Sequence, residues 1–341
     1  MTADEPSGGS DAGEKHAGRG LEAERGGSST GRPTVEGVHV LDLEHVGVSG
    51  AICTYLLDTS EPVLVDPGPA TTLPTLKEKL AELGMEPSDL RHLLLTHVHL
   101  DHAGAAGHLA RNSPRLSVHV HQDGAPHMAD PERLVASTRR SFGDDHDRLW
   151  GDVLPVPEDQ LRAWRPGDPR PLSGWRPLPT PGHIGHHLAW EEERVGVLFG
   201  GDSLGIVLEP SAPSHPATPP PAVDLTAWRE TLQRALAPVE VDAFAATHFG
   251  LHGGLHRRRH ELLEALRTLT RRVRGAMEEG PDAAEADREA FQRETVETQG
   301  RFLAPDRATA YFSTFSARAD WDGIRFRLER RPEDAGVLLA R

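Results

Sequence analysis

The sequence lacks several features that would place it in a broad class at once. Its 341 residues contain one cysteine, Cys53, which excludes an internal disulfide and fits a reducing compartment. Lysine and arginine number 37 against 52 acidic residues, so the formal net charge is −15 and general nucleic-acid binding is disfavoured. No apolar run approaches the ~18 residues of a membrane span, and no signal-peptide core is present. We therefore expect a soluble cytoplasmic protein that binds neither nucleic acid nor a membrane.

Large apolar residues are almost absent from residues 1–33, which consist mainly of Gly, Ser, Glu, Asp and Ala. Such a segment cannot bury enough surface to fold. The composition predicts a disordered leader over residues 1–33, a main domain over 34–255 and a C-terminal extension over 256–341.

Apolar runs and helical patterns alternate after the leader. Leu73, Leu76, Leu80 and Leu83 recur on one face of a helix that Gly84 ends. The strand–helix–strand rhythm indicates a layered α/β fold. Strands are predicted at 38–43, 52–57, 63–65, 93–95, 116–120, 187–190, 195–199 and 241–246, with short strands within 155–181. Helices are predicted at 225–236, 262–277, 284–299 and 306–331.

The most informative stretch is residues 96–102, with the sequence Thr-His-Val-His-Leu-Asp-His. It follows the apolar run 93–95, which predicts a buried strand followed by a polar loop. Imidazole nitrogens and carboxylates suit zinc and related metals. Because neighbouring residues in one loop point in different directions, two ions that share the motif are the easier geometry. The candidate ligands are His97, His99, Asp101 and His102.

Three later residues can supply the further ligands that two ions need. His183 follows Thr-Pro-Gly, Asp202 follows Phe-Gly-Gly, and His248 follows Ala-Ala-Thr. An earlier aspartate, Asp66, ends the apolar run Leu-Val and precedes Pro-Gly. Each of these residues lies at the end of an apolar or turn-rich segment.

The ordered motifs HxHxDH, Gly-His, Gly-Asp and Thr-His resemble the metallo-β-lactamase superfamily, and Asp66 matches the earlier strand-end aspartate of that family. The resemblance covers roughly residues 35–255. It implies an α/β fold, a four-layer αββα sandwich, in which residues 34–255 form the catalytic domain. The C-terminal helical extension lies outside the minimal family pattern.

The resemblance also implies a role for each candidate. Two zinc ions are expected per chain, with iron or manganese as alternatives. They would activate a shared water as nucleophile, which Asp101 is expected to orient as a catalytic residue. Asp66 is expected to orient the metal loop without binding metal. One ion would be held by His97, His99 and His183, the second by Asp101, His102 and His248, and Asp202 would bridge both.

The Thr-Pro-Gly-His turn and the Asp101–His102 pair look most like the glyoxalase II (hydroxyacylglutathione hydrolase) and lactonase branch. We therefore expect a zinc hydrolase that cleaves a carbonyl ester, thioester or lactone in a small molecule. The basic cluster and tyrosines that bind glutathione in glyoxalase II are not found, since only Tyr55 and Tyr311 occur. The alternatives are an iron-dependent sulfur dioxygenase-like oxidoreductase and, with less support, a phosphodiesterase or a non-catalytic metal-binding protein.

Several other residues lie close to these motifs without belonging to them. Residues 209–222 form a Pro-rich loop that could be a lid or an interface. The extension is expected to cover part of the site or to form a homodimer contact. His119 and His121 are expected to be polar-face or helix-covered histidines, and His186 and His187 are expected to be neighbours of the ligand His183. A helical insertion over residues 131–150 is expected to cover the site. Four basic residues could face a substrate there: His127 just before the insertion, and Arg139, Arg140 and His146 within it. Ordinary surface positions explain these residues as well.

Overall fold

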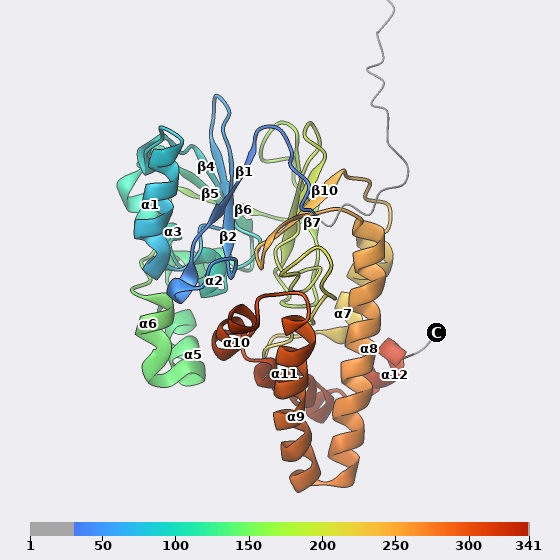
Figure 1. Cartoon of the computed structure of the whole chain (residues 1–341). Helices are drawn as coiled ribbons and strands as arrows, with labels where there is room; N and C mark the ends of the chain where they lie inside the picture. Colours follow the sequence, from blue (N-terminus) through green and yellow to red (C-terminus); the bar gives the residue numbers. More distant parts are fainter. Residues whose placement is uncertain (1–30, 340–341) are drawn as a thin grey trace, which may run out of the picture. The chain divides into compact units, whose positions relative to one another are not determined.

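The computed structural model describes residues 31–339, in which two β-sheets lie face to face (Figure 1). The first sheet has the strand order β1-β2-β3-β4-β5-β6, and the second has the order β11-β10-β9-β8-β7. Both sheets are mixed, because β3 to β6 run parallel in the first and β9 runs parallel to β10 in the second. The strands of the first sheet are β1 (Val38–Asp42), β2 (Cys53–Leu57), β3 (Val63–Val65), β4 (His92–Leu94), β5 (Ser117–His121) and β6 (Leu161–Trp164). Those of the second are β7 (Trp175–Pro179), β8 (Leu188–Glu192), β9 (Val197–Phe199), β10 (Ala243–Ala246) and β11 (Gly250–His252).

Helices cover the outer face of each sheet. Leu76 and Leu80 of α1 (Leu73–Glu82) pack with Leu64 and Val118 of the first sheet. On the second sheet, α7 (Leu225–Glu230) and α8 (Leu255–Glu279) contribute to a shared core with Phe244. A third core fills the space between the sheets. The chain therefore forms the predicted four-layer αββα sandwich with C-terminal helices.

The remaining helices connect these layers. Short 3-10 turns are η1 (His45–Gly47), η2 (Ala70–Thr72), η3 (Pro87–Asp89) and η4 (Gly143–Asp145). Helices before the extension are α2 (Leu100–Ala103), α3 (Ala106–Asn112), α4 (Ala125–Ala129), α5 (Glu132–Phe142) and α6 (His146–Trp150). The extension continues from α8 with α9 (Pro281–Gly300), α10 (Pro305–Thr314), α11 (Ala317–Arg330) and α12 (Glu333–Leu339). In Figure 1, α9 runs back beside α8, and α10 and α11 return toward the end of the sheets.

The structure refines several predicted boundaries. The apolar face of α1 ends before Leu83, which follows the helix and is 38% exposed. The helix expected at 225–236 changes after α7 into a π-helical segment, η5 (Thr231–Ala235). The helix expected at 306–331 is two helices, because the chain turns at Phe315 and the side chain of Ser316 caps α11. Neither β11 nor α12 was predicted.

The predicted leader of residues 1–33 lies outside the described residues except for its last three. There, Arg32 donates hydrogen bonds to the carbonyl oxygens of Phe249 (2.7 Å) and Leu208 (2.6 Å). The division between residues 34–255 and 256–341 stays a prediction. Across residues 31–339, no helix has the length and apolar character needed to cross a membrane.

Candidate metal centre

The first half of the candidate site comes from a single loop. Strand β4 is central in its sheet and largely buried, and the chain leaves its carboxyl end as the loop that carries His97 and His99. Helix α2 begins at Leu100, so Asp101 and His102 lie in its first turn. Four candidate ligands are thus fixed by one strand end and one helix start.

The second half comes from three separate loops of the other sheet. His183 follows β7, Asp202 follows β9, and His248 follows β10. Each loop leaves a strand of the second sheet at the end that faces the β4–α2 loop. All seven predicted ligands are therefore brought together.

The seven side chains form three overlapping groups whose ligand atoms lie within 4.8 Å of one another. The first group comprises His97, His99 and His183, and the second group comprises Asp101, His102 and His248. A middle group of His97, His102 and Asp202 shares one residue with each of them. In the first group, Nδ1 of His99 lies 2.8 Å from Nε2 of His97 and 2.9 Å from Nε2 of His183. The ring nitrogens of the first group thus converge on Nδ1 of His99.

Asp202 connects the first and second groups. One carboxylate oxygen, Oδ2, lies 3.4 Å from Nε2 of His183. The other, Oδ1, lies 3.5 Å from Nε2 of His102 and 3.8 Å from Nε2 of His248. The two oxygens of one side chain therefore face different groups.

Asp66 lies behind the cluster and fixes its geometry. Its carboxylate accepts hydrogen bonds from the backbone N–H of Thr96 (2.8 Å) and from the hydroxyls of Thr96 (2.7 Å) and Thr247 (3.0 Å). Nδ1 of His102 lies 2.8 Å from the same carboxylate. A proton on Nδ1 directs the lone pair of Nε2 into the cluster. The structure thus places Asp66 in contact with the metal loop, and its orienting role stays a prediction.

His186 and His187 pack against the cluster as neighbours. Nε2 of His186 accepts from the backbone N–H of Val98 (3.3 Å), and Nε2 of His187 accepts from that of Asp202 (3.2 Å). Gly201 makes this approach possible, since a Cβ there would lie 2.6 Å from the Thr96 hydroxyl and 2.8 Å from Nε2 of His187. Its φ of +49° also favours glycine.

The electrostatics of the cluster favour bound cations. Burial lowers the pKa of His97 well below its ordinary value, and nearby His102 adds to the effect. Burial opposes ionisation of Asp202, but His102, His183 and His248 hold its pKa well below its usual range. Among the ion pairs of residues 31–339, the partners of Asp66, Asp101 and Asp202 are all histidines. Burial opposes protonation of His102, but these carboxylates raise its pKa well above its ordinary value, so the cluster attracts positive charge.

The donor atoms fit a metal on a second, geometric ground. Nε2 of His102 and Oδ1 of Asp202 are buried and lack a hydrogen-bond partner within the described residues. Buried polar atoms are nearly always paired, so unpaired ones that face each other indicate a missing ligand. Imidazole nitrogen with carboxylate oxygen is a donor set for zinc, iron or manganese.

Other residues singled out in the sequence lie elsewhere or have partners of their own. His119 is on β5, where its Nε2 lies 3.2 Å from Nδ1 of His92. In the helical pair α5–α6, Arg139 pairs with Asp147 (2.7 Å) and Nε2 of His146 lies 2.9 Å from the Thr138 hydroxyl. These contacts support structural roles for His119, Arg139 and His146.

The sequence did not identify the residues that the extension contributes to the site. The Tyr311 hydroxyl lies 3.0 Å from Nδ1 of His248, and the ring of Phe315 lies 4.8 Å from the His248 ring. The scarcity of tyrosine was the one sequence signal that could have drawn attention to Tyr311. Phe315 also contacts the ring of Trp150, 6.2 Å away.

His45 is a second residue that the sequence did not reveal. It is fully buried, its ring contacts those of Trp150 and Phe315, and neither ring nitrogen has a partner among the described residues. Burial lowers its pKa to about 4, against the opposing effect of Asp101. The flanking residues Glu44 (φ 48°) and Val46 (φ 50°) adopt left-handed backbone, which is strained for a β-branched residue.

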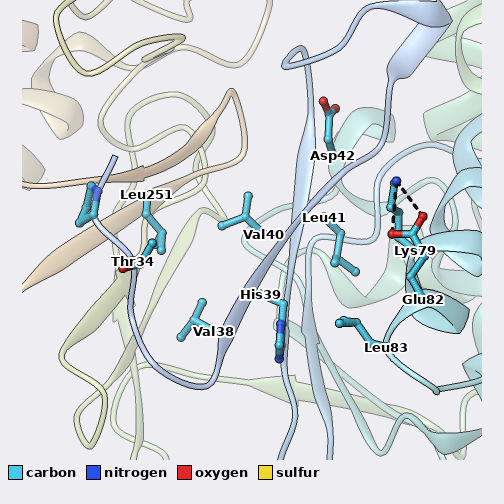
Figure 2. A pocket seen from close by; sticks show the side chains of 11 residues that line it. Thr34, Val38, His39, Val40, Leu41, Asp42, Lys79, Glu82, Leu83 and Leu251 are labelled. Atoms are coloured by element: carbon cyan, nitrogen blue, oxygen red, sulfur yellow. Dashed lines mark hydrogen bonds and ion pairs between the residues drawn. The ribbon is translucent and has the colours of Figure 1, made fainter. Parts of the chain in front are cut away.

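The cluster is distinct from the surface pocket in Figure 2. That pocket has a volume of about 500 Å³ and lies along the edge strand β1. Its wall includes Val38, Val40 and the ion pair of Lys79 with Glu82. None of the seven candidate ligands lines it.

Comparison with known proteins agrees with this geometry. The model of the metallo-beta-lactamase superfamily matches residues 47–248, the span that carries the seven candidate ligands. The chain belongs to this superfamily. The match ends at His248, so the C-terminal helices lie outside it.

Curated relatives match part of this metallo-beta-lactamase superfamily chain. The probable metallo-hydrolase YqjP of Bacillus subtilis (strain 168) is 29% identical over 180 residues, covering 46% of this chain and 53% of the relative. The probable metallo-hydrolase YflN of the same organism is 25% identical over 191 residues, covering 52% and 67%. The chain spans about half the length of the curated relatives it matches.

Solved structures show the shared fold. A metallo-beta-lactamase family protein from Thermus thermophilus has a TM-score of 0.58 at 23% identity, covering 87% of this chain and 94% of that one. An archaeal superfamily protein from Sulfolobus tokodaii has a TM-score of 0.54 at 22% identity, covering 70% and 87%. The first of these alignments includes most of the described residues.

Proposed function

We propose that this chain is a dinuclear zinc hydrolase that cleaves a carbonyl ester, thioester or lactone in a small molecule. One observation carries the proposal: the two oxygens of Asp202 face two different groups of converging ligand atoms. A structural zinc site would be a closed set of four ligands, commonly with cysteine. This cluster has seven candidate ligands, and the only cysteine, Cys53, is a buried strand residue.

In this proposal the first group would hold one ion, the second group would hold the other, and Asp202 would contact both. Bound zinc supplies Lewis acidity, which polarises a substrate carbonyl and makes water nucleophilic near neutral pH. His102 and His248 present Nε2 to the site because their Nδ1 atoms face Asp66 and Tyr311. Fixed tautomers of this kind keep ligands ready for binding.

Asp101 is the proposed catalytic residue of the chain itself. Its side chain is 14% exposed, whereas those of His102, His183, Asp202 and His248 are at most 4% exposed, so it lies at the accessible side of the cluster. Burial raises its pKa, but His102 and His248 more than offset this and hold the pKa below its ordinary value. The anionic carboxylate can accept a hydrogen bond from attacking water and so orient it.

The wall beside His248 supports an uncharged, partly apolar substrate. Phe315, which is half-buried, forms an aromatic wall there, and the buried rings of Trp150 and His45 pack behind it. Such a wall suits the apolar part of an ester, thioester or lactone. The glyoxalase II and lactonase branch is thus our proposal for the substrate class, and a cytoplasmic location and a homodimer remain further expectations.

The test is hydrolysis of a panel of aryl esters, acyl thioesters and lactones by zinc-loaded protein. We expect turnover of at least one class, with retained activity in the His119→Ala control and none in Asp202→Ala. Turnover that survives Asp202→Ala would rule out the dinuclear mechanism. Oxygen uptake with a persulfide, in place of hydrolysis, would instead support the sulfur dioxygenase alternative.

A further inference from the structure

The C-terminal helices lie outside the matched family segment, yet α10 contacts the candidate ligand His248 directly and α11 contacts the loop that carries the partner of His183. His183 and His248 are the two candidate histidine ligands that come from loops of the second sheet. In each, Nε2 faces the cluster and Nδ1 faces away from it. The hydrogen-bond partner of each Nδ1 therefore decides which tautomer the histidine adopts.

For His183, the partner is a carbonyl of the Pro-rich loop 209–222. Its Nδ1 lies 2.7 Å from the carbonyl oxygen of Ala217, which can only accept, so Nδ1 carries the proton and Nε2 is free to bind metal. This loop is not an exposed lid, because Ala212, His215, Ala217 and Thr218 are buried.

Asp320 of α11 fixes the loop on either side of this carbonyl. Its side chain accepts from the backbone N–H of Thr218 at 2.6 Å and lies 2.8 Å from Nε2 of His215. Its own carbonyl accepts from the Thr218 hydroxyl at 2.8 Å. These three contacts involve His215 and Thr218, which lie on either side of Ala217, the residue whose carbonyl contacts His183.

The backbone of α11 also touches this loop directly. A Cβ on Gly323 would lie 1.6 Å from the carbonyl oxygen of Thr218, so only glycine allows the approach. Asp320 and Gly323 are one helical turn apart and therefore share a face of α11. The loop is seated on that face by a charged side chain and by close backbone contact.

For His248, the partner comes from α10. The Tyr311 hydroxyl lies 3.0 Å from Nδ1, and the Ala51 carbonyl lies 3.3 Å from the same atom. Tyr311 is 1% exposed, so its hydroxyl has little competition from solvent. The Ala51 carbonyl can only accept, which favours a proton on Nδ1, and the Tyr311 hydroxyl oxygen can accept from the same N–H and so leave Nε2 free.

We propose that Asp320 and Tyr311 are positioning residues through which the C-terminal helices preset the tautomer and orientation of His183 and His248 for metal binding. The inference rests on the proposed metal-dependent function. It makes the extension part of the metal site, with Asp320 serving the first group and Tyr311 the second.

The test measures zinc affinity of the full chain by competition with a chromophoric chelator, after metal removal by dialysis. Asp320→Ala should weaken one of two zinc sites by about tenfold, the lower end of the effect of outer-shell partners. Tyr311→Phe should weaken the other site by about threefold, because the Ala51 carbonyl remains. The double variant should weaken both sites.

Asp322→Ala is the matched control. Asp322 lies two residues away on α11 and pairs with Arg288 at 2.9 Å, away from the loop. The Asp322→Ala variant loses an ion pair of α11 but should bind zinc at both sites with unchanged affinity. Asp320→Asn retains an acceptor for the Thr218 N–H and should recover part of the lost affinity.

The outcomes separate this inference from the proposed function. Two unchanged zinc affinities in folded Asp320→Ala and Tyr311→Phe, or equal losses in Asp322→Ala, would overturn the inference while leaving hydrolysis untouched. Site-selective losses in a protein that hydrolyses nothing in the substrate panel would support the inference and reject the function. A wild-type chain that binds no zinc would reject both.

Discussion

The two halves of the metal cluster are built in different ways. The first-sheet half places four candidate ligands on one loop, and its anchor, Asp66, ends the neighbouring strand β3. The second-sheet half places one ligand on each of three loops; the extension contacts His248 directly and reaches His183 only through the 209–222 loop. Local sequence is enough to build the first half, whereas the second depends on contacts between distant segments.

The strongest way to break this arrangement is to remove the residue that joins the halves. Asp202→Ala should reduce turnover by more than the roughly 100-fold that loss of an outer-shell partner causes, and should lower metal content, because both groups lose an oxygen. Metal analysis and kinetics on the purified variant test this. Normal turnover with normal metal content would refute the joining role.

Removing the anchor of the first half should have the next largest effect. Asp66→Ala leaves the N–H and hydroxyl of Thr96 and the Nδ1 of His102 without their buried acceptor, so we expect a loss of about 3 kcal/mol in unfolding free energy. Zinc affinity should fall more than in Asp320→Ala, since Asp66 contacts its ligand directly. Chemical denaturation measures the unfolding free energy, and chelator competition measures the zinc affinity. A smaller loss of zinc affinity in Asp66→Ala than in Asp320→Ala would contradict the expected order of the two effects.

His45 tests whether the aromatic wall contacts substrate. His45→Phe keeps the packing against Trp150 and Phe315 but removes two unpaired buried nitrogens, so the variant should be about 1 kcal/mol more stable. If His45 meets substrate, kcat/KM should nevertheless fall by about tenfold, the worth of one net hydrogen bond, with unchanged metal content. Unchanged stability and unchanged kcat/KM would show that the ring only fills space.

His119 gives the smallest expected effect on function and a clear one on pH dependence. Burial lowers its pKa to about 3, helped by His92 and Arg162. As pH falls below the ordinary value near 6.5, the unfolded chain gains a proton that the folded chain takes up only near pH 3. Stability should therefore fall over this window, and less steeply in His119→Ala. Parallel pH profiles would contradict this, and loss of metal would show that His119 belongs to the site.

Much of this fold could be predicted because its determinants are local. The fully buried strands β3 and β9 appear as apolar runs, and each ligand follows such a run or a turn. Helical segments at 262–277, 284–299 and 306–331 of the extension were predicted from periodicity, but not α12 or the break at Phe315, where the side chain of Ser316 caps α11. Strand β11 is only Gly250–His252, too short to produce a pattern.

The contacts behind the ligands could not be predicted from local sequence. Asp320 is 137 positions from His183 in the chain, and the buried His215 between them resembles any loop histidine in the sequence. Tyr311 and Phe315 follow the periodicity of an ordinary amphipathic helix, so core packing was the simpler interpretation. Only the path of α10 and α11 places these residues at the cluster.

The most direct test of the central claim is the metal content of wild-type protein purified without added metal, measured by inductively coupled plasma mass spectrometry. Two divalent ions per chain, predominantly zinc, is the result that this account predicts. One ion per chain, or none in a folded protein, would contradict the assignment of two groups joined by Asp202.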